Sequence, residues 1–229
     1  MITIETIIIA GLISVLVFGF VMDGYAVFLR VAGVEGLAES LAMANLVQYI
    51  ARISNVLVIF VLSFAFETGR LKTNIAAIFL VASFLGLGAV LALVRSKAFC
   101  GLVTFSVRPM LYFSFRQMSG KPVWRNLGAF QKGSLKLAGI STVTNTLIVL
   151  AMFVPFGIAS YYPEMRMTSV YVGQLINFLA TLLVFAIQDP VSMRLVDVGV
   201  FEDVGVALLY GRVVSYFVAG VLFVALVFL

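Results

Sequence analysis

Long apolar runs separated by polar links dominate the chain. They predict six helices of membrane-spanning length, at Thr3–Met22, Leu41–Phe66, Asn74–Val94, Leu137–Ser160, Thr168–Ile187 and Val204–Leu229. Roughly 18 or more apolar residues are the usual requirement for a helix that crosses a bilayer. Short links, such as Glu67–Thr73, predict that neighbouring helices run antiparallel. The pattern therefore predicts an all-α, polytopic membrane helix bundle, with residues 1–229 forming a single transmembrane domain.

The first apolar run differs from a secretory signal peptide. Its opening, "MITIETIII", contains Glu5 and no Lys or Arg, whereas a signal peptide begins with a basic segment. The run is also long for a signal core. We therefore expect it to be the first permanent span.

Composition narrows the chemistry that the chain can perform. Of its residues, 63% are hydrophobic and only 11% are charged, whereas soluble domains carry about a quarter charged residues. The chain contains no histidine, and Cys100 is its single cysteine. Disulfides within the chain, histidine-ligated haem and the usual zinc or iron–sulfur sites are excluded. The commonest general base is also missing. We therefore expect no cofactor, no metal and no enzymatic activity.

The central segment between the third and fourth spans, residues 95–136, is basic and rich in aromatic residues. It carries eight Lys or Arg residues and no Asp or Glu. Cations mixed with aromatic rings suit the membrane–water interface. A segment that only sets the topology is an equally weighted alternative, and nucleic-acid binding is disfavoured because the segment is tethered to the membrane. Within it, Ala98–Phe115 is expected to be interfacial or re-entrant, and a seventh span is the less favoured reading.

The distribution of Lys and Arg predicts the orientation. With six spans, the first, third and fifth links share one side and hold ten of these residues, whereas the second and fourth links hold three. Because cytoplasmic loops are enriched in Lys and Arg, we expect the central segment to be cytoplasmic and both termini to be extracytoplasmic.

Two predicted spans contain an arginine within a polar helical face. Arg52 lies four residues after Gln48 and three before Asn55, and Arg212 is followed at the same spacings by Ser215 and Tyr216. Residues three and four apart share one face of a helix. A charge near the bilayer centre costs roughly 2.5–3.5 kcal/mol on insertion scales, so it normally faces a bundle interior or a hydrated cavity. A binding role is therefore favoured for both arginines.

Uncharged polar residues line two further spans. Gln174, Asn177 and Thr181 align on the fifth, and the fourth opens with the polar stretch "GISTVTN". Such residues often do no more than join neighbouring helices, at about 0.6 kcal/mol each, and for these two spans that reading is favoured.

Acidic partners for the arginines are few. Glu5, Asp23, Glu67 and Asp189 are expected near span ends, and within the membrane only Arg212 is expected to reach one of them. Arg52 is left without a counter-charge. This predicts an anionic ligand or a hydrated cavity beside Arg52.

Two motifs resemble the Amj family of lipid II flippases. "DGYAVFLRVAGVEG" (Asp23–Gly36) is followed at short distance by "ARISNVL" (Ala51–Leu57), and "QDPVSMRLVD" (Gln188–Asp197) is similar to a late acidic-proline segment of that family. The resemblance covers roughly the first 60 residues and the segment near Asp189. Asp23 stands where the family would have glutamate, and Glu35 where a basic residue is frequent. The matching residues are Asp23, Arg30, Ala32, Gly33, Arg52 and Asn55.

The resemblance implies a flippase of the bacterial cytoplasmic membrane that moves a lipid-linked cell-wall precursor. Arg52 and Arg212 would bind the pyrophosphate, and Arg30 would lie on the cytoplasmic side of the same path. Membrane lipids would surround a lateral opening, and a homodimer is one way to complete the path. The expected headgroup contacts are Gln48, Asn55, Gln174 and Asn177, and the candidates for ion coupling are Glu5, Asp23 and Asp189.

Three other classes of function stay open. A small-solute transporter, or a substrate-capture subunit for an anionic vitamin-like ligand, would use the same polar residues. An intramembrane enzyme is disfavoured by the missing histidine and by the lack of a paired-carboxylate motif. An inert structural subunit is the remaining possibility.

Overall fold

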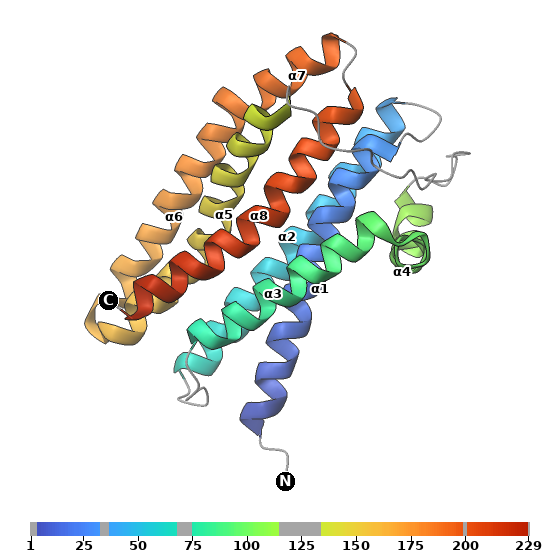
Figure 1. The fold of residues 1–229 in the computed structure, drawn as a ribbon. Coiled ribbons are helices and arrows are strands. Elements are labelled where there is room, and N and C mark those ends of the chain that lie inside the picture. Colours follow the sequence, from blue (N-terminus) through green and yellow to red (C-terminus); the bar gives the residue numbers. More distant parts are fainter. Residues whose placement is uncertain (1–3, 33–36, 68–74, 115–133, 199–200, 229) are drawn as a thin grey trace.

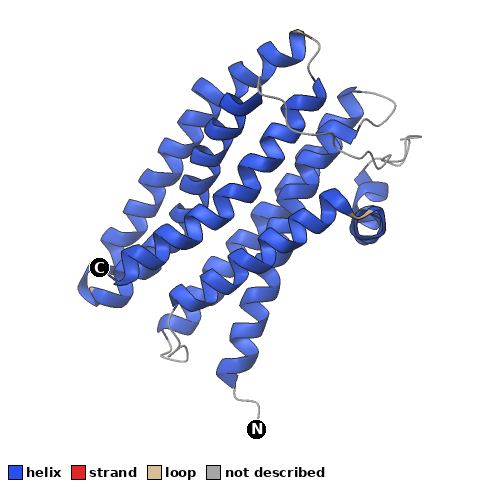
Figure 2. Ribbon diagram, viewed as in Figure 1, coloured by secondary structure: helices blue, strands red, loops and turns tan. Residues whose placement is uncertain are grey.

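The structure is a computed structural model that describes residues 4–32, 37–67, 75–114, 134–198 and 201–228. All secondary structure in these ranges is helical (Figure 2). The eight numbered α-helices are α1 (Ile4–Ala32), α2 (Leu37–Glu67), α3 (Ile75–Arg95), α4 (Lys97–Ser114), α5 (Leu135–Tyr161), α6 (Arg166–Leu183), α7 (Asp189–Asp197) and α8 (Phe201–Phe228). The prediction of an all-α membrane bundle is confirmed.

The long helices pack as an antiparallel bundle, with α1 in contact with α2, α3 and α8, and α5 in contact with α6 and α8 (Figure 1). Among the residues that the structure describes, five helical segments are long and apolar enough to cross a membrane, or six if the bent pair of α3 and α4 counts as one span. The chain is a multi-pass membrane protein. Within the described ranges, the start of α1 and the end of α8 lie at the same end of the bundle.

Apolar side chains fill the centre of the bundle. Phe79 of α3, Phe153 of α5 and Phe223 of α8 form an aromatic cluster, with ring centroids 3.8 Å apart for Phe79–Phe153 and 5.2 Å apart for Phe79–Phe223. Each of the three side chains is almost fully buried. Aromatic pairs at these distances add stabilisation beyond the burial of their surface. This cluster fixes α8 between α3 and α5.

The first span is longer than predicted. The expected end at Met22 is wrong, because α1 continues to Ala32 and its apolar segment runs from Glu5 to Arg30. The prediction ended the run at Asp23 because a carboxylate is costly in lipid. In the folded chain this carboxylate pairs with a cation of α8. Asp23 therefore lies inside an apolar segment of membrane-spanning length, and Asp189 lies toward the end of another such segment, Pro163–Leu195.

The helix α4 turns away from the bundle. It follows α3 at an angle of 104° and packs beside α2 and α3 through Cys100, Val103 and Val107. Leu102 and Phe105 face outward. The prediction of an interfacial or re-entrant helix at Ala98–Phe115 agrees with this bend. The rest of the central segment, residues 115–133, lies outside the described residues.

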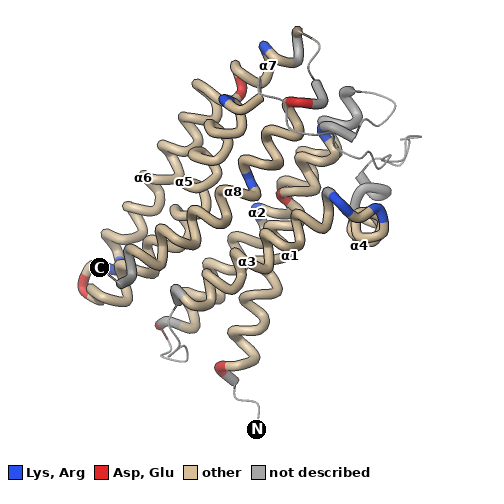
Figure 3. Tube along the Cα trace, in the orientation of Figure 1, with Lys and Arg blue, Asp and Glu red and all other residues tan. Residues whose placement is uncertain are grey.

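Charged side chains are sparse in the bundle and gather toward one end (Figure 3). The helix termini at this end carry Arg30, Arg95, Lys97, Lys136 and Arg194. The opposite end holds Glu5, Glu164 and Arg166. The first, third and fifth links between the spans therefore lie at the same end of the bundle, as an arrangement of six spans requires. Which side faces the cytoplasm stays a prediction.

Candidate functional site

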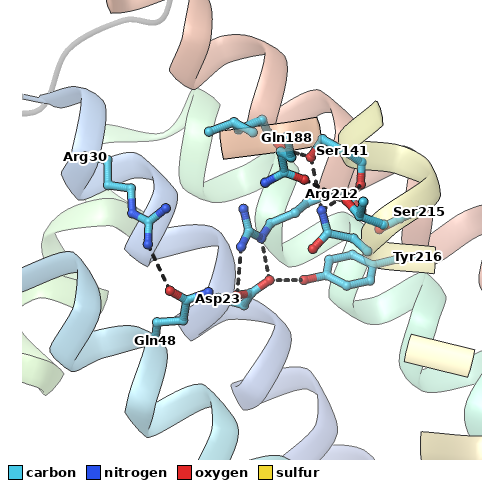
Figure 4. Close-up of polar contacts among 11 residues, drawn as sticks. Asp23, Arg30, Gln48, Ser141, Gln188, Arg212, Ser215 and Tyr216 are labelled. Carbon is cyan, nitrogen blue, oxygen red and sulfur yellow. Dashed lines mark hydrogen bonds and ion pairs between the residues drawn. The ribbon is translucent and has the colours of Figure 1, made fainter. Parts of the chain in front are cut away.

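An ion pair between a buried arginine and a partly exposed aspartate joins α1 to α8. Arg212 donates from Nε to Asp23 Oδ2 at 2.5 Å and from Nη2 to Asp23 Oδ1 at 3.1 Å (Figure 4). Only 5% of Arg212 is exposed. Two parallel bonds to one carboxylate use the planar fork of the guanidinium fully. The sequence prediction that Arg212 could reach an acidic residue is confirmed, and its partner is Asp23.

Neighbouring groups hold this pair in place. The Tyr216 hydroxyl donates to Asp23 Oδ2 at 3.3 Å, and its ring lies 4.4 Å from that of Phe20. Ser215 donates back to the Arg212 carbonyl at 2.7 Å. Both residues come from the polar face of α8 that the sequence indicated. Oδ2 of Asp23 thus accepts two hydrogen bonds, one from Arg212 Nε and one from the Tyr216 hydroxyl.

A close contact between α5 and α8 lies directly beside Arg212. A Cβ on Gly211 would lie 2.5 Å from Ser141 Cβ and 2.9 Å from the Ala138 carbonyl oxygen, so only glycine fits without a shift of the backbone. Ser141 donates to the Leu208 carbonyl at 3.3 Å, and Asn145 donates to the Ser141 hydroxyl at 3.0 Å. The polar start of the fourth predicted span therefore joins helices, as expected.

A π-helical segment, η3 (Val184–Gln188), interrupts the junction of α6 and α7. Its last residue, Gln188, is buried and accepts a hydrogen bond from the Thr144 hydroxyl at 2.7 Å. Sequence reasoning missed Gln188, although a lone amide that ends an apolar run before Asp189-Pro190 was a usable signal. Such segments are frequent at functional sites. This one sets the position of Asp189 at the start of α7.

A second guanidinium, that of Arg30, lies on the same face of α1 as Asp23. The two are seven residues apart, which is two helical turns or about 10 Å along the axis. Arg30 Nη2 donates to Gln48 Oε1 at 2.9 Å and to Asn45 Oδ1 at 3.2 Å. Its Nε is buried and has no hydrogen-bond partner. Within the described part of the chain, Arg30 is thus bonded to two neutral amides and to no carboxylate.

Arg30 interacts electrostatically with four other charged side chains. Two are cations, the buried Arg212 and the exposed Arg52, and two are carboxylates. These five groups contain three cations and two anions, so the cluster has one positive charge in excess. We call it the arginine cluster; its members are Asp23, Arg30, Arg52, Asp189 and Arg212.

Arg52 lies on the outer surface of α2 and not in the bundle interior; the alternative expectation, an anionic ligand or a hydrated cavity beside it, stays a prediction. Its side chain is exposed, and its guanidinium carbon lies 5.7 Å from the centre of the Tyr49 ring. Helix α2 buries Val47, Ala51 and Ser54 instead, because these small side chains allow close packing on α1. Arg52 is therefore near Arg30 but on the lipid-facing side of the helix.

The remaining predicted site residues lie in four places. Gln48 joins the site through Arg30, and Asn55 is half-buried beside Gly19 of α1. Gln174 and Asn177 are exposed on α6. Glu5 lies in the first turn of α1, at the other end of that helix from Arg30. The structure thus brings together Arg30 with Gln48 and Arg212 with Asp23, with Asp189 and Arg52 within electrostatic range of Arg30, and it leaves Glu5, Gln174 and Asn177 apart from them.

The site has the chemistry of anion binding. Among the described residues, no three His, Cys, Asp or Glu side chains lie close enough to hold a metal ion. Guanidinium groups with unused donors match phosphate or carboxylate oxygens.

The structure thus defines a multi-pass helical membrane protein in which a buried arginine of α8 pairs with an aspartate of α1, beside other arginine and aspartate side chains that are partly or fully exposed. Comparisons of the chain with protein-family models, with curated proteins and with solved structures found no match.

Proposed function

We propose that this protein is a flippase for lipid II, the undecaprenyl-pyrophosphate-linked precursor of peptidoglycan, in the bacterial cytoplasmic membrane. One observation carries the proposal. Arg30 bonds no carboxylate in the described part of the chain; it lies two helical turns from Asp23, the partner of the buried Arg212, and it donates to Gln48, one helical turn before the exposed Arg52. Three guanidinium groups thus connect the lipid-facing surface to the bundle interior. The resemblance of the Asp23–Gly36 and Ala51–Leu57 motifs to the Amj family supports the same substrate.

This arrangement suits an amphiphile with an anionic headgroup. The polyprenyl tail can remain in the hydrocarbon beside α2 while the pyrophosphate meets Arg52. The Nε of Arg30 is buried and unbonded, so it becomes available to the phosphate once the Arg30 side chain turns toward it, and Gln48 and Asn55 offer amides to the sugar–peptide headgroup. A phosphate lies favourably between two guanidinium forks because each can donate two parallel hydrogen bonds. Arg95 at the end of α3 and Lys136 at the start of α5 would attract the anionic lipid to this side of the membrane.

Asp23 acts in this mechanism as a stand-in for the substrate anion. Its carboxylate fills the guanidinium fork of Arg212 at rest. A pyrophosphate that reaches Arg212 competes with this carboxylate, and the displaced Asp23 is then free to bind a proton or a cation. Asp189 lies within electrostatic range of Arg30 and is the second candidate for coupling to a proton or a cation. Glu5, at the opposite end of α1, is the third.

The test is rescue of bacterial cells whose lipid II flippase has been shut off. The full-length protein should restore growth, and Arg30→Gln should abolish it at equal membrane levels. In vesicles that contain lipid II, the same variant should lower the flipping rate roughly tenfold or more, because a charge-assisted hydrogen bond contributes about 1.5–3 kcal/mol. Arg166→Gln, at the opposite end of the bundle, is the matched control and should retain activity. Full activity of Arg30→Gln would refute the assignment.

A transporter or capture subunit for a small anionic ligand is the alternative. The exchange of Asp23 for a ligand carboxylate at Arg212 would fit it equally well. Native mass spectrometry of the purified protein separates the two functions. A retained polyprenyl lipid supports the flippase, and a retained water-soluble anion supports the alternative.

A further inference from the structure

The helix α6 is the least covered part of the bundle. In an 18-residue apolar window of the span Pro163–Leu195 only 11% of the residues are buried, compared with 56% for the window of α5 and 61% for that of α8. Its main neighbour is α5, which it approaches closely at Gly173. Figure 1 shows α6 at the edge of the bundle. Most of its surface is therefore open to lipid or to another protein.

A polar stripe runs along this open surface. Gln174, Asn177 and Thr181 are exposed, and the exposed Val170 extends the stripe by one turn. Thr181 donates to the Asn177 carbonyl at 2.8 Å. The amides of Gln174 and Asn177 have no hydrogen-bond partner among the described residues. Lipid tails offer neither donors nor acceptors, so two adjacent amides are costly on a lipid-facing surface.

The spacing of the stripe is that of a helix–helix seam. Val170, Gln174, Asn177 and Thr181 follow one another at intervals of four, three and four residues, which is the a/d repeat of a left-handed helix pair. A side-chain amide is both a donor and an acceptor, so one copy of the stripe complements another. Polar side chains of this kind join helices within membranes.

We propose that the stripe on α6 is the interface of a homodimer. Two copies meet with their α6 helices side by side, related by a twofold axis along the membrane normal, so that identical residues face each other. The Asn177 amides bond across the axis, and those of Gln174 bond one turn away. This inference does not depend on which molecule the protein transports.

Cysteine cross-linking in native membranes tests the interface. The full chain carries Cys100→Ala, which removes its single cysteine, and one new cysteine at a time. Asn177→Cys and Val170→Cys should yield disulfide-linked dimers on oxidation. Leu179→Cys is the matched control, because Leu179 is also exposed but lies about 200° around the helix from Asn177. It should not become cross-linked. Equal cross-linking at Asn177 and Leu179 would show random collision and would overturn the proposal.

A second measurement guards against misfolded variants. Copies labelled with donor and acceptor fluorophores are mixed in phospholipid vesicles, and energy transfer is followed as lipid is added. The doubly substituted variant Gln174→Ala, Asn177→Ala should dissociate at a protein-to-lipid ratio roughly tenfold higher than the unaltered chain, since interhelical polar contacts are worth about 0.6–1.7 kcal/mol each. Leu175→Ala and Leu179→Ala together should not shift the ratio. Absence of energy transfer in the unaltered chain would also refute the homodimer.

Discussion

Arg212 and Arg52 are two intramembrane arginines with opposite environments. Arg212 is buried, makes two hydrogen bonds to Asp23 and has Tyr216 beside it. Arg52 is exposed and contacts the ring of Tyr49. The sequence around each is similar, with polar residues at three and four positions away. Their difference shows that a polar helical face does not by itself determine whether that face is turned inward.

The helices that neighbour each arginine explain the difference. Around Arg212, α8 contacts α1, α3 and α5, so a charge on this helix has to be compensated inside the bundle. Around Arg52, α2 packs mainly on α1, and small side chains on a different face of α2 make that contact. The first arginine therefore contributes to the fold, whereas the second is available to a ligand.

The largest effect is expected when one partner of the buried pair is removed. Asp23→Asn leaves the Arg212 guanidinium buried without a counter-charge, which costs about 3–5 kcal/mol. The variant should lose the folded monodisperse state in detergent at a lower temperature than the unaltered chain, measured by fluorescence-detected size-exclusion chromatography after heating.

A second substitution separates stability from function in this pair. Asp23→Asn combined with Arg212→Gln removes both charges and should recover most of the lost thermal stability, while rescue of flippase-deficient cells should stay lost. If the double variant were as unstable as Asp23→Asn alone, loss of the counter-charge could not be the cause.

A smaller effect is expected at the contact that keeps Arg212 inside. Gly211→Ala places a Cβ 2.5 Å from Ser141 Cβ and 2.9 Å from a backbone oxygen, so α5 and α8 have to separate. Overpacking of this kind costs about 1–3 kcal/mol. Gly139→Ala is the matched control on α5, because a Cβ there meets nothing within 4 Å. The melting temperature should therefore fall in Gly211→Ala and should not fall to the same extent in Gly139→Ala. Equal melting temperatures of the two variants would contradict the close approach of α5 and α8.

The sequence predicted the helical class and the main spans well, because apolar runs of membrane length leave few alternatives. The predicted end of the first span at Met22 was wrong, because a carboxylate such as that of Asp23 is normally placed in water. The compensating cation lies 189 positions along the chain, and no local pattern reveals such a pairing.

The candidate site was predictable in part. Helical periodicity predicted that Arg212, Ser215 and Tyr216 share one face, and all three are buried. It did not predict that Asp23 of α1 is the partner of this face. The face of Gln48 and Arg52 was equally regular, yet packing on α1 turned it so that only Gln48 reaches Arg30. Periodicity predicts which residues share a face, whereas tertiary packing decides what that face meets.

The smallest effect on stability is expected at Arg52, which makes this residue the sharpest test of the comparison. Arg52→Leu removes a charge that the bundle does not use and a cation–π contact worth about 0.5–1 kcal/mol at an exposed site. Leucine is also favourable in lipid by comparison with arginine. The melting temperature should therefore change by no more than a few degrees, whereas lipid II flipping in vesicles should fall.

Arg52→Lys distinguishes how the arginine acts. If Arg52 attracts the pyrophosphate through its charge, lysine should retain part of the flipping rate. If it holds two phosphate oxygens in its planar fork, lysine should be as inactive as leucine, because an ammonium group cannot make that bidentate contact. Unchanged flipping in both variants, at equal protein levels, would remove Arg52 from the substrate path and leave Arg30 and Arg212 as its cations.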